Sequence, residues 1–434
     1  MAINFERLPL RDAPAPHGAA SVAATTVNLI KVCIGTGVLA IPHAFASGGV
    51  VLMLALLLLI TFWTEWCSRT LLRCRSLLTD TENDGVSKAR GETSFAALAR
   101  AAAGAAGSAT IDTLTATLMF GVCIAYFVAF KDFISATPVA VFGTPYVAAV
   151  AALPLAMVSD IGQLAPVASC GLAGLGVAFV AIVWHGVSAA FSARKDASTD
   201  AALAWVSTTR AAAASGFGTL SFCFGGTPLV LQIEATMREP SSFVFALRCA
   251  LTVTCVIYFF FGTGVACLYS RDGGQVNGDI LDNLPRDGLD DVVRCAMALA
   301  CIASAPLAIV TAGEVIEKRA FRETAPAKRL AVRSALALSA AAVAAALPLF
   351  AIVVSLVGGF LASLLSFIVP PLLHLLLSQR ARRREGAKAA PCADVAVDAA
   401  ALLLGVAVVV FATALTVTEA EIDVSAYFAA KATK

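Results

Sequence analysis

Two glycine-containing segments inside long apolar stretches are the parts of this sequence best suited to binding a small polar molecule. They are Ile34–Gly37 and Phe224–Pro228. Each glycine weakens a helix by roughly 1 kcal/mol, and Pro228 lacks a backbone N–H group, so we predict a helix break in each segment. A broken helix presents free N–H groups at one end and free carbonyl groups at the other. Such ends match the carboxylate and the ammonium of a zwitterion.

The composition indicates the environment of these segments. The chain has 434 residues, of which 59% are hydrophobic and 14% are charged, with a net charge of +2. Its mean hydropathy is +0.85, whereas about a quarter of the residues of a soluble domain are charged. This composition excludes a disordered chain, a soluble globular protein and a nucleic-acid-binding surface. We therefore predict an all-α membrane protein.

Apolar runs of about 20 residues, the length that crosses a bilayer, predict eleven transmembrane helices. The expected spans are 22–45, 49–72, 109–136, 144–159, 164–190, 211–236, 243–269, 289–316, 331–353, 355–378 and 396–418. Residues 1–20 are expected to form a disordered tail. The Lys and Arg clusters at 318–333 and 380–384 fall on the same side as this tail, which places the N-terminus in the cytoplasm. The loop 271–291, which contains six aspartates, then faces outward.

The positions of the two breaks predict an internal repeat. They lie in the first and sixth spans, so a second half that begins at the sixth span is inverted relative to the first. Residues 21–190 would form the first repeat, residues 211–378 the second, and residues 395–418 an eleventh helix outside both. Close packing of small residues would explain either break alone. Matched breaks in two inverted halves are instead typical of a transporter with a binding site at the midplane.

A charged residue lies close to the first break. Lys31 precedes Gly35 by about one helical turn, within the apolar part of its span. A charge at that depth is costly and usually functional. The alternative is that Lys31 extends its ammonium to the membrane surface as an anchor.

At these same residues the sequence resembles the amino acid/auxin permease family, a branch of the amino acid–polyamine–organocation superfamily. Asn28–Phe45 is similar to the first-helix signature of that family, and Phe217–Phe243 is similar to its sixth helix and exit. Further similarity covers Thr93–Gly107, Leu153–Ser169 and Leu356–Pro370. The resemblance implies amino acid transport on a LeuT-type fold, a 5+5 inverted repeat with one extra C-terminal helix.

The resemblance places the substrate site at the two breaks. The residues expected to surround the substrate are Ile34, Gly35, Thr36, Gly37, Phe222, Phe224, Gly225 and Gly226. The two phenylalanines would narrow the pocket. No carboxylate stands at the second break to pair with a cationic side chain, so we expect small neutral amino acids as substrates.

The resemblance also indicates residues that would couple transport to an ion. In sodium-coupled relatives, an asparagine at the position of Lys31 binds the ion together with a hydroxyl residue on the eighth span, here Ser304. An ammonium at this position would repel Na⁺, so we expect proton coupling or uniport. Animal proton-coupled relatives carry a histidine where Asn28 stands, so that titratable group is missing. The candidate coupling residues are Asn28, Lys31 and Ser304, and no metal site is expected.

The same sequence bears on two alternatives to transport. An amino acid sensor would bind its ligand on the same fold without appreciable flux. An enzyme is not expected, because the chain has no HExxH motif and no nucleophile elbow, and we expect no cofactor. The expected partners are an amino acid, H⁺ in the proton-coupled case and the lipid bilayer, but no nucleic acid. The expected location is the plasma membrane or a vacuolar or lysosomal membrane.

Overall fold

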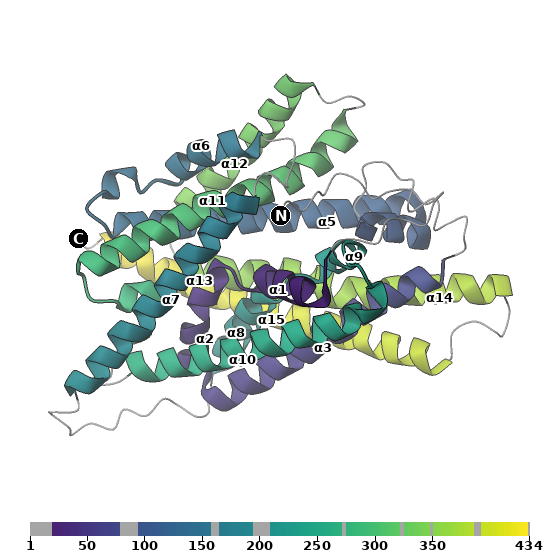
Figure 1. The fold of residues 1–434 in the computed structure, drawn as a ribbon, viewed down its shortest axis with the longest axis horizontal. Coiled ribbons are helices and arrows are strands. Elements are labelled where there is room, and N and C mark those ends of the chain that lie inside the picture. The colour runs from purple at the N-terminus through teal and green to yellow at the C-terminus, as the bar shows by residue number, and fades with distance from the viewer. Residues whose placement is uncertain are drawn as a thin grey trace.

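The structure is a computed structural model whose described part consists of helices that run roughly along its long axis (Figure 1). It describes residues 20–78, 94–157, 165–193, 209–270, 275–321, 325–347, 350–385 and 392–432. Almost all of the tail that was expected to be disordered, residues 1–20, lies outside these ranges. An isolated β-bridge joins Ala20 to Met237. The all-α fold class follows from the helices of the described part.

The helices of the N-terminal half include a first span made of three pieces. Their bounds are α1 (Val22–Cys33), η1 (Thr36–Ala40, a 3₁₀-helix), α2 (Ile41–Gly48), α3 (Val50–Ser76), α5 (Ser94–Ser135), η2 (Ala140–Phe142, a 3₁₀-helix), α6 (Pro145–Ala156) and α7 (Ala165–Ala193).

The C-terminal half begins with a second interrupted span. Its helices are α8 (Arg210–Cys223), α9 (Val230–Ala235), α10 (Phe243–Tyr269), α11 (Gly288–Ala320), α12 (Pro326–Ala346), α13 (Phe350–Leu356), α14 (Val369–Glu385) and α15 (Cys392–Ala432). Three 3₁₀-helices connect them: η4 (Thr227–Leu229), η5 (Pro240–Ser242) and η7 (Ile280–Asn283). Two π-helical turns, η8 (Val357–Ala362) and η9 (Leu364–Ile368), separate α13 from α14.

The structure supports a multi-pass membrane protein but does not confirm eleven spans. In the described part, eight helices are long and apolar enough to cross a bilayer, or nine if the bent pair of α1 and α2 counts as one span. The span expected at 144–159 corresponds to a shorter apolar helix, Pro145–Ala156. The span expected at 164–190 falls in α7, of which the stretch Ala173–Ala189 counts as a shorter apolar helix. Since α6 has 12 residues, it is about 18 Å long, less than the roughly 30 Å of a bilayer core.

Helix α5 is longer than the expected third span because it also includes a helical segment that precedes a bend. Ala103 and Gly104 have non-helical backbone angles, and the φ of Gly104 is 69°. Glycine takes this left-handed conformation without the steric cost that a Cβ imposes. The residues before Gly104 therefore form a separate helical segment that leads into the expected span at 109–136.

The broken sixth span packs closely against the π-helical part of the tenth. A Cβ atom added to Gly218 of α8 would overlap the backbone of Ser355, and one added to Gly358 of η8 would overlap the backbone of Gly218. The two backbones therefore touch, which only small residues permit. π-Helical turns are frequent at functional sites, and this one supports the helix that carries the second glycine segment.

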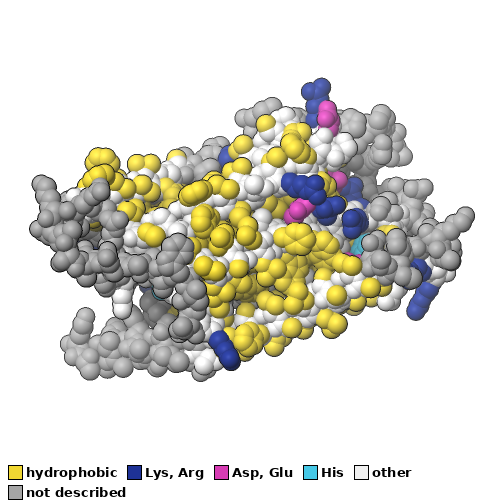
Figure 2. Space-filling view, turned by 90° about the horizontal axis from the view of Figure 1, so that it is seen from below, with side chains coloured by type: hydrophobic (Ala, Val, Ile, Leu, Met, Phe, Trp, Pro, Cys, Tyr) yellow, Lys and Arg dark blue, Asp and Glu magenta, His cyan; other side chains and the backbone are white. Residues whose placement is uncertain are grey.

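The surface of the molecule agrees with a lipid environment. Hydrophobic side chains cover the middle of the face shown in Figure 2, and most of the visible Lys and Arg side chains lie toward one end. Phe62, Phe260 and Leu403 are each more than half exposed. Large exposed apolar surfaces are rare on soluble monomers.

Candidate functional site

The helix break predicted in the first span is present. Helix α1 ends at Cys33, Gly35 is extended with φ −129° and ψ −169°, and η1 begins at Thr36. The helical segments on the two sides of the break are bent by 55° relative to each other. The extended backbone at Gly35 turns the chain away from the axis of α1.

The break leaves backbone groups without helical partners. The amide of Ile34 still donates to the carbonyl of Ile30 at 2.8 Å, and the next such bond runs from Val38 to the carbonyl of Gly35 at 3.1 Å. Between these two bonds, the amides of residues 35–37 donate no hydrogen bond within the described part of the chain. Unpaired N–H groups inside a membrane protein are costly. This stretch therefore has three donors available to a ligand.

The second break leaves fewer backbone amides without a hydrogen bond than the first. After α8 ends at Cys223, the amide of Gly225 donates to Phe222 at 3.2 Å, and the amide of Gly226 donates to Phe224 at 2.8 Å. Consecutive turns thus satisfy most of the amides that the break releases. The buried hydroxyl of Thr227 finds no hydrogen-bond partner among the described residues. The two breaks are therefore not equivalent, because only the first leaves a run of free amides.

The two breaks lie against each other. A Cβ atom on Gly37 would lie 2.7 Å from Cδ1 of Phe222, and a Cβ atom on Gly226 would lie 2.8 Å from Cγ1 of Val32. By contrast, a Cβ atom on Gly35 would meet no other atom within 4 Å. The structure therefore brings together the residues predicted at the two breaks and leaves open space beside Gly35.

The two predicted phenylalanines have different environments. Phe222 is only partly buried and contacts the first break, whereas Phe224 is fully buried. The ring of Phe224 packs edge-on against Tyr258, with 5.4 Å between the ring centroids.

Tyr258 of α10 joins the two breaks, although its sequence position did not single it out. Its hydroxyl donates to the carbonyl of Cys33 at 2.6 Å, and its ring contacts Phe224. The side chain is fully buried. A tyrosine within an apolar span needs a hydrogen-bond partner for its hydroxyl. This need is the one sequence signal that would have identified Tyr258. The signal was hidden because three phenylalanines follow Tyr258 directly.

The predicted coupling residues are not brought together. Lys31 is exposed and Asn28 is half-buried, both on α1. Ser304 of α11 lies beside Gly171 of α7 and within hydrogen-bonding reach of Tyr126 of α5. The described part of the chain shows no contact between Lys31 and Ser304.

The segment 275–287 covers the first break on the side predicted to face outward, and we call it the cap. Its 3₁₀-helix η7 contacts η1, and Ile280 and Leu281 are fully buried. Nδ1 of His43, on α2, donates to the carbonyl of Val276 at 2.8 Å. A Cβ atom on Gly278 would lie 2.8 Å from Cβ of Ala351 on α13. The cap is thus bound to both the first and the tenth span.

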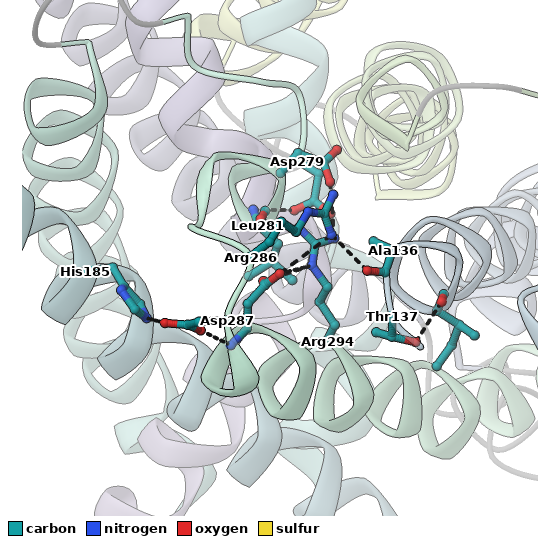
Figure 3. A network of polar contacts seen from close by, with 11 residues as sticks. Ala136, Thr137, His185, Asp279, Leu281, Arg286, Asp287 and Arg294 are labelled. Carbon is teal, nitrogen blue, oxygen red and sulfur yellow. Dashed lines mark hydrogen bonds and ion pairs between the residues drawn. The ribbon is translucent and has the colours of Figure 1, made fainter. Parts of the chain in front are cut away.

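A buried arginine fixes the cap to α11 (Figure 3). Nε of Arg294 donates to both carboxylate oxygens of Asp290 at 2.9 and 3.0 Å. The other nitrogens of Arg294 donate to Asp282 at 3.2 Å and to the carbonyl of Leu281. Arg294 and Asp290 are fully buried. Charge-assisted bonds are about twice as strong as neutral ones, and the one to Asp282, together with the bond to Leu281, attaches the cap to α11.

Asp279 is the buried acid of the cap. Its Oδ1 accepts from the amide of Leu281 at 3.0 Å, while Oδ2 is buried without a hydrogen-bond partner among the described residues. Burial and the nearby carboxylate of Asp282 raise the pKa of Asp279 to about 8. The group therefore exchanges its proton close to neutral pH.

The opposite ends of the two broken spans are also joined. The amide of Ala20, just before α1, donates to Thr236 at 3.1 Å, and the amide of Arg238 donates back to Ala20 at 2.9 Å. Glu234, on α9, pairs with Arg75 of α3. The bonds of Ala20 join the start of the first span to the end of the sixth, and the ion pair joins the end of the sixth span to the second.

The comparisons with known proteins agree over most of the chain. The family described as "Transmembrane amino acid transporter protein" matches residues 18–418. Amino acid transporter ANT1 of Arabidopsis thaliana is 27% identical over 82% of this chain and 85% of its own length. Amino acid transporter AVT3A of the same plant is 26% identical over 85% and 84%. Vacuolar amino acid transporter 3 of Saccharomyces cerevisiae is 28% identical over 85% of this chain and 54% of its own length.

Among solved structures, a Na⁺-coupled sialic acid symporter in a substrate-bound outward-open state is similar over 90% of this chain and 96% of its own. The two sequences are 12% identical and the TM-score is 0.36. This score is too low to assign the fold of that symporter to the chain.

Proposed function

We propose that this chain, which belongs to the transmembrane amino acid transporter family, moves small neutral amino acids by alternating access around the two helix breaks. Membership follows from the match over residues 18–418 and confirms the family that Asn28–Phe45 indicated. Family membership makes the chain a multi-pass membrane protein that transports amino acids, and not an enzyme. The substrate class, the mechanism and the coupling ion are the proposal.

The observation that carries the proposal is the run of free amides at residues 35–37. Three free N–H groups at the start of a helical segment bind a carboxylate well, because the N–H donors and the positive end of the helix dipole both attract the negative charge. The open space beside Gly35 would accept the substrate. Thr227, whose buried hydroxyl lacks a partner among the described residues, offers a polar group from the second break. Phe222 would limit the size of the substrate side chain.

Two features support a cycle in which the broken spans move. The cap binds the first break on one side, and the bridge between Ala20 and the end of α9 joins the broken spans on the other. Alternating access requires such a contact at each end, so that one opens while the other is closed. Because the two breaks lie in the first and sixth spans, we assign residues 21–190 and 211–378 to two inverted repeats and residues 395–418 to an additional helix.

Proton coupling or uniport is proposed in place of sodium coupling. Lys31 lies on α1 about one turn before the break and makes no contact with Ser304 in the described part of the chain, but its ammonium would oppose a Na⁺ bound at the break itself. The basic clusters at 318–333 and 380–384 favour a cytoplasmic N-terminus. The name of the yeast relative favours a vacuolar or lysosomal membrane over the plasma membrane as the location.

The test is uptake by the purified full-length chain in liposomes. Labelled amino acids, chosen as small neutral, large neutral, acidic and basic, are offered under an imposed pH gradient, a Na⁺ gradient or no ion gradient. We expect saturable uptake of the small neutral amino acids that a Na⁺ gradient does not increase. Stimulation by Na⁺ would contradict the coupling proposal. Binding without flux would favour the amino acid sensor instead.

A further inference from the structure

The buried Arg294 of α11 has more carboxylates around it than its hydrogen bonds reach. Four carboxylates gather around Arg294, on Asp132, Asp279, Asp282 and Asp290. Arg294 directs its hydrogen bonds to Asp290, Asp282 and the carbonyl of Leu281, and none of these bonds reaches Asp279. A buried carboxylate oxygen without a donor is unfavourable unless the group is protonated.

Among the described residues around Asp279, no other cation compensates its charge. From its own segment it faces Asp282, from α11 it faces Arg294 and Cys301, and from α5 it faces Asp132. The Lys131 ammonium lies 3.8 Å from Asp132, and Arg286 lies 3.6 Å from Asp290. On α2, His43 is engaged with the carbonyl of Val276, and α13 contributes Ala351 beside Gly278.

The position of Asp279 connects it to the substrate site. It begins η7, and η7 contacts η1, the 3₁₀-helix that follows the first break. Its carboxyl group also interacts electrostatically with Cys301 of α11, one turn before Ser304. Opening the cap would bring Asp279 into water, and closing the cap would return it to this buried position.

We propose that Asp279 is a proton-binding site, and that closing the cap over the first break takes up one proton from the outer side. This inference rests on the proposed transport cycle, in which the cap opens and closes. It names the proton as the partner of that cycle and Asp279 as the group that receives it. Closure would then be coupled to an acidic outer solution.

The sign of the pH effect follows from the raised pKa. The pKa of Asp279 rises from 3.8 to about 8 when the group is buried in the closed cap, so the closed state binds the proton more tightly. Between these two values, closure becomes easier as the pH falls, by about tenfold per pH unit for a single proton. Below the lower value and above the higher value, the two states carry the same charge and the dependence disappears.

The direct test is an infrared titration of the purified full-length chain. We expect the band of a protonated carboxyl group to disappear with a midpoint near pH 8 in the wild type. Asp279→Asn should lack this band. Asp291→Asn, which removes an acidic charge from the first turn of α11, should retain it. If no carboxyl group of the wild type titrates above about pH 6, or if Asp279→Asn keeps the band, the inference is wrong.

A second experiment measures amino acid uptake into liposomes while only the outer pH is changed. Wild type and Asp291→Asn should lose uptake as the outer pH rises toward 8, whereas Asp279→Asn should lose most of this dependence. An unchanged pH dependence in Asp279→Asn would overturn the inference and leave amino acid transport intact. Absence of flux in the wild type would instead overturn the proposed function, and the infrared titration would still test Asp279.

Discussion

The hydroxyl of Tyr258 donates a 2.6 Å hydrogen bond to the carbonyl of Cys33, the last residue of α1. In a continuous helix the amide of Gly37 would bond this carbonyl, but the break removes that amide. Tyr258 therefore replaces a lost backbone bond and fixes the end of α1 to α10. Its ring also contacts Phe224 at the second break, so one side chain holds both breaks in their relative positions.

Removal of this hydroxyl should impair transport more than stability. Tyr258→Phe keeps the ring contact and leaves the Cys33 carbonyl unpaired, which costs about 1 kcal/mol. We expect the KM for substrate to rise several-fold with a small loss of thermal stability. Tyr269→Phe is the matched control, because that hydroxyl donates to Ile182 of α7 at 2.9 Å, away from the breaks. Equal effects of the two changes on KM would contradict a role of Tyr258 in the site.

Two glycines of the first break should respond differently to alanine. Gly37→Ala places a Cβ atom against Phe222, so we expect lower thermal stability, by roughly 1–3 kcal/mol as for other overpacked sites. Gly35→Ala meets no atom of the protein, so we expect normal stability but loss of substrate binding, because the Cβ fills the space proposed for substrate. Thermal unfolding and binding of a labelled amino acid measure the two effects. Full binding by Gly35→Ala would exclude that location for the substrate.

The charge of Lys31 should decide which ion drives transport. Lys31→Asn removes the ammonium that opposes Na⁺, so we expect uptake to become responsive to a Na⁺ gradient or to lose its response to a pH gradient. Lys31→Arg keeps the positive charge and should retain the ion dependence of the wild type. Uptake into liposomes under each gradient is the measurement. An unchanged ion dependence in Lys31→Asn would remove Lys31 from the coupling mechanism.

A buried pair should attach the last helix to the tenth span. His374 of α14 bonds Asp398 of α15, and both side chains are almost fully buried. His374→Ala leaves the Asp398 carboxyl without this partner, so we expect a loss of about 3–5 kcal/mol in thermal unfolding. His185→Ala, which removes a weaker pairing with the half-exposed Asp287, should cost less.

A double replacement distinguishes the cost of an unpaired Asp398 carboxyl from the cost of lost packing at His374. Because two apolar residues need no partner, His374→Leu combined with Asp398→Leu should recover much of the stability that His374→Ala loses. A double variant as unstable as His374→Ala would show that the loss does not come from leaving the Asp398 carboxyl unpaired.

Local features of the sequence were sufficient for the membrane class and for the first break. Apolar runs report burial in lipid directly, and the glycines around Thr36 weaken their helix whatever surrounds it. The same local reasoning overestimated the likeness of the two breaks, because it did not include the turns that satisfy the amides of Gly225 and Gly226. It also extended the fourth span beyond α6, which is 12 residues long.

The polar contacts that organise the site were decided by the tertiary structure alone. Tyr258 lies 225 residues from Cys33, and His43 lies 233 residues from Val276. Asp279 is one of six aspartates in a loop predicted to face outward, and it is buried in a cap that packs against α2, α11 and α13. A hydrogen bond or a buried charge depends on where another segment is placed in space. Hydropathy and helix propensity depend only on neighbours along the chain, so they predict the spans but not these partners.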